Sequence, residues 1–566
     1  MNKLVIAQEI KNVDDYSINK LKIPSLVLME RAAYSVFEVL KEKELLSFNK
    51  RPKILILCGM GNNGADGVAL ARIIACDELP SEVNIMLIGD VETASDEMLS
   101  QLEMARNIGL SFVDCDDNIN AVRGYDIIID GIFGIGLKRD IEGIQRKIIE
   151  NVNAVDAFKV AIDIPSGLCA DTGAIRGVAL KCDITVTFGP VKAGLTVYNG
   201  LTITDATMCS LIGHPLVAFY ENDYVKDKQR NDAYQELAFV TEADMQNIPV
   251  RKRYSNKGDF GKILVVAGSN KVYGAAHLCA KAAYKTGAGL VKVLSDKENK
   301  LAIEQTIPEA LIETYDSEKL LSLSGSLNQL EESIKDNIAW ADIVSVGSGI
   351  GTGKVSDFIF RNVLKYARQF NKQLIIDADG INLMAEDDTL LMGLKSLEKP
   401  AILTPHLKEM ERISGKKIEE IRNNLFGSVE EFVRKYGVIC VLKDASTLIS
   451  KKGFTAVSLR GNSSMAKGGS GDVLAGIIAG MNALMPDSFY ATALAVFIHG
   501  YAGELASRRR GMHSSLASDI VDNIENVIML NVAGRTDEEF KENLAGQIDY
   551  INNQIVDIMK SLGLEE

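Results

Sequence analysis

The chain has 566 residues, of which 47% are hydrophobic, 24% charged and 6% aromatic. This length predicts more than one domain, and the composition is that of ordinary globular proteins, so a single small binding module and a wholly disordered chain are excluded. The 62 Lys and Arg residues are outnumbered by 76 Asp and Glu, which leaves a net charge of −14. This balance disfavours general binding to nucleic acid or to anionic membranes, and we expect neither as a partner.

Cysteine usage and hydropathy favour a cytoplasmic protein. The eight cysteines include no CxxC pair, which predicts buried free thiols in a reducing compartment. Residues 1–9 lack a long apolar core, so we expect no secretory signal. The longest apolar stretch near a helix, Val473–Met485, has 13 residues. A membrane span needs ~20, so this stretch predicts a buried helix.

The first part of the chain predicts an α/β domain, because short β-branched runs alternate with helical patterns. We expect helices at Ser25–Lys43 and Asp66–Cys76. We expect buried strands at Ile54–Cys58, Asn84–Ile88, Asp126–Asp130, Lys159–Ile164 and Asp183–Phe188. Strands of this kind form a parallel sheet with helices on both faces.

A glycine-rich turn follows the first of these strands. Residues Gly59–Gly64 have the form GxGxxG, and Asp66 follows them. One interpretation is a dinucleotide site, with Asp90 where a ribose-binding acid is expected. A second is that the two Asn residues bind the sugar or phosphate of a ligand, or turn carbonyl oxygens toward a cation. A third is that Asn-Asn-Gly serves only the turn.

Polar side chains also stand at the ends of two later strands. Asn63, Asp130 and Ser166 are hard oxygen donors with one formal charge, which suits a weakly charged cation better than zinc. Asp163 is then free for proton transfer. Each acid taken alone is also compatible with a strand-end or capping residue that has no catalytic role.

These motifs resemble the NAD(P)H-hydrate epimerase domain of the YjeF N-terminal type, over roughly residues 1–220. The resemblance is carried by Pro24–Ala32, Gly61–Gly67, Ala71-Arg72, Phe133–Arg139 and Asp163–Gly167. It implies a Rossmann-like domain that interconverts the R and S epimers of hydrated NADH and NADPH (NADHX and NADPHX). It also implies K+ bound by Asn63, Asp130 and Ser166, and a catalytic role for Asp163. The substrate-binding residues it implies are Asn62, Asn63, Gly64, Ala65, Asp66, Gly134, Ile135, Gly136, Leu137, Lys138, Arg139, Asp140 and Asp163.

The sequence departs from that family at Ala65, where the family usually has Gly. If the turn requires a positive φ at this position, the added methyl group weakens ligand binding without abolishing it.

A domain boundary is expected between about residues 222 and 258, where the chain is polar and loses the alternating pattern. Its end, Arg251–Arg253, is predicted to be a solvated loop. The boundary divides an epimerase-like domain at 1–222 and a linker at 223–258 from a second α/β domain at 235–530. Strands of the second domain are expected at Lys262–Ala267, Leu290–Val293, Asp342–Val346, Gln373–Asp377, Ala401–Thr404 and Val438–Leu442, and late helices at Asp472–Met485 and Tyr490–Ala506.

A helical extension is predicted at residues 531–566. Thr536 and Glu539 fit a capping box, and one apolar stripe follows from Phe540 to Leu562. This amphipathic helix is expected to dock on the body of the protein, with self-association or a partner helix as the alternatives. We expect a homo-oligomer.

The second domain contains a glycine-rich loop, Asn462–Asp472, that leads into an apolar helix. Converging backbone amides and the helix N-terminus favour an anion there. Asp472, in the first turn, either caps the helix or acts as a base toward a hydroxyl beside a bound phosphate. An anion site with a nearby carboxylate is typical of phosphoryl transfer, and the absence of GxxxxGK[ST] excludes a P-loop.

This half resembles the ribokinase-like superfamily, and within it the ADP/ATP-dependent NAD(P)H-hydrate dehydratases, over residues 235–525. The resemblance is carried by Lys257–Gly261, Ala267–Ser269, Tyr273–Ala276, Gly347–Gly351, Asp377–Gly380, Thr404–His406, Gly468–Asp472 and His499–Gly503. It implies that ADP or ATP, with Mg2+, phosphorylates the hydrate hydroxyl and that phosphate then leaves. The sequence departs from this family at three positions, where Lys467 replaces the usual Thr, Asp444 replaces a Gly and Asn256 replaces a His. The resemblance places Ala275, Gly349, His406 and Asp472 against the hydrate, and Lys443, Asp444, Ala445, Ser446, Thr447 and Gly471 against the nucleotide.

The two resemblances predict a bifunctional repair enzyme, an isomerase joined to a lyase, in which one half epimerises the hydrate and the other dehydrates the S epimer. The alternative is a ribokinase-like small-molecule kinase with an inactive, nucleotide-sensing first domain. A binding or scaffold module without turnover is a third hypothesis.

Overall fold

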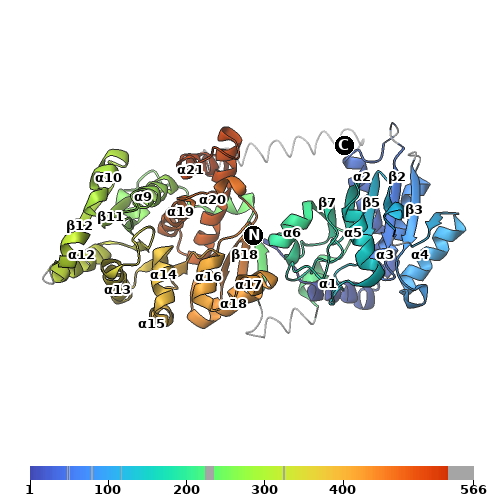
Figure 1. Cartoon of the computed structure of the whole chain (residues 1–566), viewed down its shortest axis with the longest axis horizontal. Coiled ribbons are helices and arrows are strands. Elements are labelled where there is room, and N and C mark those ends of the chain that lie inside the picture. Colours follow the sequence, from blue (N-terminus) through green and yellow to red (C-terminus); the bar gives the residue numbers. More distant parts are fainter. Residues whose placement is uncertain are drawn as a thin grey trace, which may run out of the picture.

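The computed structural model describes residues 1–47, 49, 51–77, 81–115, 118–222, 235–322 and 326–532. These residues form two halves, each built on its own sheet, which lie side by side in Figure 1 with the N-terminus between them. The expected helix at 531–566, with its capping box and apolar stripe, lies outside the described residues apart from its first two positions.

The sheet of the first half has seven strands in the order β4-β3-β2-β5-β6-β7-β8, and every neighbouring pair is parallel. Its strands are β2 Lys53–Cys58, β3 Glu82–Leu87, β4 Ser111–Val113, β5 Ile127–Gly131, β6 Phe158–Ile162, β7 Cys182–Phe188 and β8 Thr204–Ser210. The helices of this half are α1 Ala7–Asp15, α2 Ser25–Glu42, α3 Asn62–Cys76, α4 Asp96–Asn107, α5 Gly143–Asn153, α6 Tyr198–Ile203 and α7 Leu216–Tyr220.

Helices cover both faces of this sheet. Ile54 and Ile56 of β2 belong to an apolar cluster with α2, α3 and α4, whereas Leu55 and Leu57 belong to a second cluster with α5. Alternate residues of a strand point to opposite faces, so a strand buried on both sides is apolar throughout. The carboxyl ends of the parallel strands meet at one edge of this sheet, which is where its polar motifs come together.

The sheet of the second half has eleven strands in the order β1-β9-β18-β17-β16-β15-β14-β13-β10-β11-β12. Strands β10 to β16 are parallel, β17 is antiparallel to both of its neighbours, and β1 at the edge is antiparallel to β9. The bounds are β1 Asn2–Lys3, β9 Glu236–Phe239, β10 Lys262–Val266, β11 Leu290–Asp296, β12 Leu311–Tyr315, β13 Ile343–Val346, β14 Gln373–Ile376, β15 Ile402–Leu403, β16 Ile439–Leu442, β17 Thr447–Lys451 and β18 Phe454–Ser458.

Helices also cover both faces of the second sheet. Ile263 and Val265 of β10 pack with α9, α19, α20 and α21, while Leu264 and Val266 pack with α12, α13, α14, α16 and α18. The helices are α9 Gly274–Thr286, α10 Lys300–Thr306, α11 Ser317–Ser322, α12 Ser326–Trp340, α13 Lys354–Gln369, α14 Asp379–Glu386, α15 Asp388–Gly393, α16 Leu407–Ser414, α17 Ile418–Asn423, α18 Leu425–Tyr436, α19 Ser470–Leu484, α20 Ser488–Arg510 and α21 Ala517–Val532.

The eleven strands and four helices predicted from the sequence are confirmed, with small shifts at their ends. The edge strands β1, β4, β8 and β12, and the group β9, β17 and β18, were not predicted. In β8, for example, most residues are exposed or partly exposed, so the strand lacks the apolar run that marks the central strands.

Two further expectations have clear outcomes. The eight cysteines are free, but Cys76 and Cys209 are exposed and Cys115 is only half-buried, so the prediction of burial is wrong for these three. Helix α19 is buried through its middle, as its apolar sequence predicted. No described helix is long and apolar enough to cross a membrane.

Candidate active sites

A cavity of about 950 Å³ lies at the carboxyl edge of the first sheet. Ten of the predicted epimerase residues line it: Asn62, Asn63, Asp66, Gly134, Ile135, Gly136, Leu137, Lys138, Arg139 and Asp163. Gly64, Ala65 and Asp140 are not among its lining residues, and Asp90 is. Its volume is that of a site for a small molecule or cofactor.

Asp163, immediately after β6, is the most constrained side chain in this cavity. Its backbone has φ 64°, a region that a residue with a side chain adopts only when the surrounding structure holds it. Its Oδ1 accepts hydrogen bonds from the Thr187 hydroxyl at 3.2 Å and from the backbone amide of Phe188 at 3.0 Å. The Asp163 carboxylate therefore has a fixed position.

The cation paired with Asp163 is Lys192, a residue that the sequence reasoning missed. Lys192 is fully buried, and its Nζ donates to Asp163 Oδ1 and, at 2.6 Å, to the carbonyl oxygen of Phe188. A buried ammonium is stable only when it is paired in this way. The only sequence signal for it was a lysine that closely follows the buried strand β7 (Cys182–Phe188).

Asp66 is a second carboxyl group in the same cavity. Its burial, and then the carboxylates of Asp163 and Asp14, raise the pKa of Asp66 well above its usual range. The cavity therefore combines a carboxylate that is paired with a lysine and a carboxyl group whose pKa is raised. Such a pair can accept one proton and donate another.

The predicted cation ligands Asn63, Asp130 and Ser166 lie together around the backbone of Phe133. Ser166 donates from its hydroxyl to Asp130 Oδ1 at 2.6 Å and from its amide to Oδ2 at 2.7 Å. Asn63 Nδ2 donates to the Phe133 carbonyl oxygen at 3.1 Å. Asp130 is fully buried. Burial raises the pKa of Asp130 to about 6, although the hydrogen bonds from Ser166 and Ile132 oppose this effect.

Ala65 does not occupy a turn that requires a positive φ, so that expectation is wrong. Ala65 lies in the first turn of α3, is fully buried, and donates its amide to Gly61 O at 3.1 Å. The position that excludes a side chain is Gly64, where a Cβ would lie 1.9 Å from Gly59 O. The methyl group of Ala65 therefore suits the helix.

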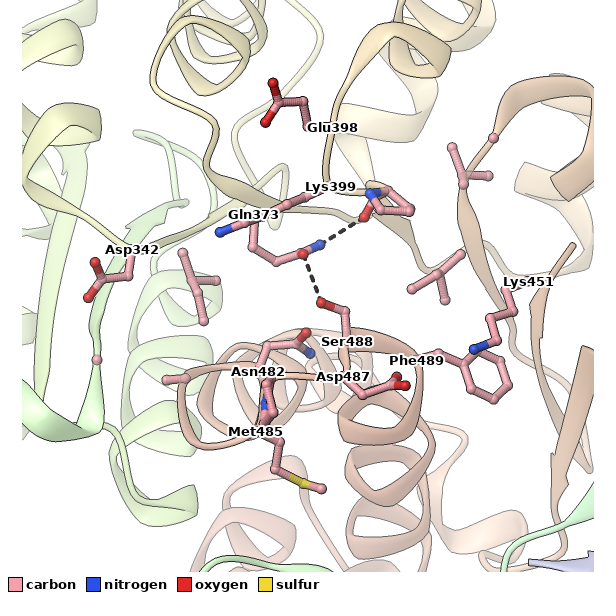
Figure 2. Close-up of a pocket in the computed structure, with 18 of the residues that line it drawn as sticks. Asp342, Gln373, Glu398, Lys399, Lys451, Asn482, Met485, Asp487, Ser488 and Phe489 are labelled. Carbon is pink, nitrogen blue, oxygen red and sulfur yellow. Dashed lines mark hydrogen bonds between the residues drawn. The ribbon is translucent and has the colours of Figure 1, made fainter.

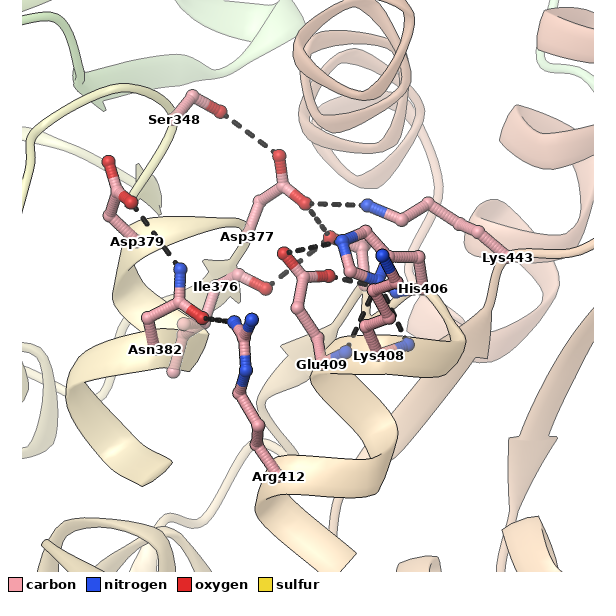
Figure 3. A network of polar contacts seen from close by, with 11 residues as sticks. Ser348, Ile376, Asp377, Asp379, Asn382, His406, Lys408, Glu409, Arg412 and Lys443 are labelled. Atoms are coloured by element: carbon pink, nitrogen blue, oxygen red, sulfur yellow. Dashed lines mark hydrogen bonds and ion pairs between the residues drawn. The ribbon is translucent and has the colours of Figure 1, made fainter. Parts of the chain in front are cut away.

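The second centre lies at the carboxyl ends of β14 and β15, around Asp377 (Figure 3). Asp377 Oδ1 accepts from Lys443 Nζ at 3.0 Å and from the Thr404 hydroxyl at 2.5 Å, and Oδ2 accepts from Ser348 at 3.3 Å. Burial alone raises the pKa of this carboxyl group, but Lys443 and the two hydroxyls hold it below its ordinary value. Asp377 was part of a recognised motif, yet sequence reasoning gave it no role.

Asp472 stands beside this pair, in the first turn of the 15-residue helix α19. A Cβ on the preceding residue, Gly471, would lie 3.5 Å from Lys443 Nζ and 3.8 Å from Asp377 Oδ2. Burial, and then the negative charge of Asp377, raise the pKa of Asp472 to about 6. A carboxylate with this pKa is a competent general base near neutral pH.

The structure places the remaining dehydratase candidates in two groups. Gly349 faces Ala275, since a Cβ on Gly349 would lie 2.9 Å from the Ala275 methyl group. His406 pairs by a backbone bridge with Lys443 and caps α16, because its Nδ1 accepts the amides of Lys408 and Glu409 at 3.1 and 3.2 Å. Burial, and then Lys443, lower the pKa of His406.

The predicted nucleotide residues Asp444, Ala445 and Ser446 form the turn between β16 and β17, and Thr447 begins β17. Asp444 Oδ2 and Ser446 Oγ are buried without a hydrogen-bond partner among the described residues. Unpaired buried polar atoms of this kind are unfavourable, and a polar ligand satisfies them. Lys467, by contrast, donates to the carbonyl oxygen of His513 at 2.6 Å.

A separate hollow of about 830 Å³ lies at the opposite edge of the second sheet (Figure 2). It is lined by the first residues of β13, β14 and β16, among them Gln373, whose amide links Ser488 to the Pro400 carbonyl group. None of the predicted site residues lines it.

Comparisons with known proteins match two separate segments of the chain. Residues 25–194 match the family model of the YjeF-related protein N-terminus, and residues 263–526 match the NAD(P)H-hydrate dehydratase family model. A bifunctional NAD(P)H-hydrate repair enzyme of Thermofilum pendens is 31% identical over 90% of this chain and 93% of its own length. The enzyme of the same name from Dictyoglomus turgidum is 32% identical over 92% and 97%. Among solved structures, an ADP/ATP-dependent NAD(P)H-hydrate dehydratase from Bacillus subtilis is 25% identical, covers 52% of this chain and 98% of its own, and has a TM-score of 0.44.

Proposed function

This chain belongs to the family of bifunctional NAD(P)H-hydrate repair enzymes, and on that premise we propose which residues perform each half of the repair. The first half, a Rossmann-like domain, epimerises R- and S-NAD(P)H hydrate. The second half, a ribokinase-like domain, dehydrates the S epimer back to NAD(P)H at the expense of ADP or ATP. The observation that carries the proposal is that each half places a constrained acid and a lysine together at the carboxyl edge of its sheet.

In the first half, we infer that the hydrate enters the 950 Å³ cavity. Asn62 and Asn63 and the loop Gly134–Arg139 bind it, and Asp163 accepts a proton from the group that reacts. Asp66, whose pKa is raised by burial and then by the Asp163 carboxylate, supplies a proton to the same ligand. Lys192 orients Asp163 through the contact between its Nζ and Asp163 Oδ1.

A potassium ion fits the cluster of Asn63, Asp130 and Ser166. Asp130 is a fully buried carboxylate whose partners are N–H and O–H groups, and no ion pair with it is found in the described part of the chain. A monovalent cation compensates such a charge, and the amide, hydroxyl and Phe133 carbonyl oxygens are the hard ligands that it prefers. When bound, the ion supplies positive charge next to a hydrate phosphate or hydroxyl.

In the second half, we infer that Asp472 is the base that takes the proton of the hydrate hydroxyl as this oxygen attacks the terminal phosphate of the nucleotide, which displaces AMP from ADP or ADP from ATP. The phosphate ester formed in this step then leaves as inorganic phosphate while the ring loses a proton, and the double bond of NAD(P)H is restored. Backbone amides at the start of α19 stabilise the phosphate. Lys443 offsets the charge of Asp377 so that the anion is not repelled. Ala275, Gly349 and His406 then lie against the hydrate.

The nucleotide is proposed to contact Lys443–Thr447 and Gly471, where Asp444 and Ser446 have buried unpaired oxygens. The described residues include no cluster of three His, Cys, Asp or Glu side chains suited to a metal ion. A magnesium ion would be held mainly by the phosphates of the nucleotide, where it would offset their negative charge.

The test is recovery of the dihydronicotinamide absorbance from a mixture of R- and S-NADHX, with K+, Mg2+ and either ADP or ATP. Rapid recovery of the full amplitude supports both activities. Recovery that stops at the S fraction contradicts an active epimerase half. No nucleotide-dependent recovery, together with a stable phosphorylated product, contradicts the proposal and identifies a small-molecule kinase.

A further inference from the structure

The first residues of the chain belong to the sheet of the second half. Asn2 and Lys3 (β1) pair with Phe239 and Ala238 of β9, and the amide of Leu4 donates to the Leu237 carbonyl oxygen at 2.9 Å. The N-terminus accordingly lies between the two halves in Figure 1. These residues are therefore anchored in the dehydratase half.

The next residue, Val5, enters the epimerase half. Its amide donates to the Val191 carbonyl oxygen at 3.0 Å, and its own carbonyl oxygen accepts the amide of Ala193 at 2.9 Å. The two hydrogen bonds flank Lys192, and Val5 is almost fully buried. The backbone on both sides of Lys192 is therefore held by Val5.

Lys192 links the position of this backbone to the reaction centre, because its Nζ donates a hydrogen bond to Asp163 Oδ1. The Lys192 side chain is fully buried, so it has no solvent-filled space in which to change its conformation if the backbone moves. Close packing transmits such a displacement to the carboxylate.

Apolar contacts stabilise the same junction. Leu4, Ala193, Val197 and Leu237 belong to one buried cluster with the core of the second half. Arg422 of α17, also in the second half, lies over the Tyr198 ring of α6 at 4.7 Å. The junction therefore resembles a domain core more than a surface contact.

We propose that Asn2–Val5, anchored on β9 of the dehydratase half, positions Lys192 and through it Asp163 of the epimerase half. The proposal rests on the role proposed above for Asp163. According to this proposal, Leu237 is a positioning residue for epimerisation although it lies outside the epimerase half.

The first test is Leu237→Ala in the full chain, which removes the packing beneath Leu4. We expect the kcat of epimerisation to fall about tenfold, because a small misplacement of a catalytic group is costly, while KM changes less than twofold. Hydrogen exchange at the Ala193 amide should become faster. Dehydration of purified S hydrate should stay as in the wild type.

The matched control is Leu391→Ala, the same truncation of a fully buried leucine in α15 of the second half. It should leave epimerisation and Ala193 exchange unchanged, which separates positioning from a general loss of stability.

A second variant lacks Asn2 and Lys3 but keeps Leu237, and it should reproduce the effects of Leu237→Ala.

Normal epimerisation and normal Ala193 exchange in both variants would overturn the proposal, as would a loss of dehydration with epimerisation intact. Asp163→Asn separates this failure from that of the proposed function. If Asp163→Asn epimerises at the wild-type rate, the role of Asp163 is wrong. If it is inactive while both variants are normal, only the positioning by Asn2–Val5 is wrong.

Discussion

The two reaction centres are built alike but use their ion pairs differently. In the epimerase half, the lysine pairs with the acid proposed to react, Asp163. In the dehydratase half, Lys443 pairs with Asp377, and the proposed base, Asp472, stands beside this pair. Each half also has a strained residue here, Asp163 with φ 64° and Ala378 with φ 46°.

The difference shows how one arrangement serves two kinds of chemistry. A carboxylate held by a buried ammonium has a fixed position, which suits a group proposed to move protons on a bound ligand. A carboxylate next to another carboxylate has its pKa raised toward neutrality, which suits a base that must gain a proton in a phosphoryl transfer. The variants below test whether the two acids are independent.

Asp472→Asn should have the largest effect. Loss of the base is expected to lower nucleotide-dependent dehydration 10²- to 10⁴-fold, while epimerisation stays at its wild-type rate. Absorbance recovery from purified S hydrate measures the first, and chromatographic separation of the epimers measures the second. The control is Asp487→Asn, which makes the same change of charge at the N-cap of α20, far from this centre, and keeps an oxygen that accepts the cap hydrogen bond. Retained dehydration in Asp472→Asn would exclude the base assignment.

Asp163→Asn should have a smaller effect, and on the other activity. Epimerisation should fall about 10²-fold, while dehydration is retained. The substitution also leaves Lys192 buried without its counter-charge, so the variant should lose about 3–5 kcal/mol of stability. Thermal unfolding measures this loss and shows whether the variant is folded at the assay temperature. The control is Asp183→Asn in β7, which makes the same change of charge at a carboxylate that accepts the Lys159 amide at 2.7 Å and keeps an acceptor oxygen for it. This variant should keep both activities.

The pH dependence of dehydration should reflect Asp472, whose pKa is about 6. A general base works only in its ionised form, so the rate should fall about tenfold for each pH unit below 6 and level off above it. Initial rates with purified S hydrate measure this, and the residual activity of Asp472→Asn should lack the dependence. A rate that stays constant through pH 6 would contradict the assignment.

The smallest effect is expected at Ala65. Ala65→Gly should lower the free energy of unfolding by about 1 kcal/mol, the helix propensity difference, and change the epimerase kcat/KM less than twofold. Gly64→Ala is the contrasting variant, since its Cβ would lie 1.9 Å from Gly59 O. It should impair epimerisation severely, and equal effects of the two variants would contradict the interpretation of this turn.

Much of each centre was predictable because its residues are local in sequence. Asn63 and Asp66 lie in the first turns of α3, directly after a strand and a glycine-rich segment. Asp472 lies in the first turn of α19, after another glycine-rich segment. Lys192 and Asp377 were not assigned, because their importance depends on a partner far away in the chain, Asp163 for the first and Lys443 for the second. The expectation of a positive φ at Ala65 was wrong, because this residue already lies in helix α3. A side chain is excluded instead at Gly64, by the close approach of the Gly59 carbonyl oxygen.

By itself, the sequence determined the alternation of strands and helices, the two glycine-rich motifs and the strand-end acids, because periodicity and turn chemistry are local properties. Only the tertiary structure decided that β1 (Asn2–Lys3) joins the sheet of the second half and that Val5 flanks Lys192. Two residues at a chain terminus carry no pattern, and their pairing with β9 (Glu236–Phe239) is set by which edge the folded sheet leaves open. The coupling of the two halves is a property of packing, which no local stretch of sequence contains.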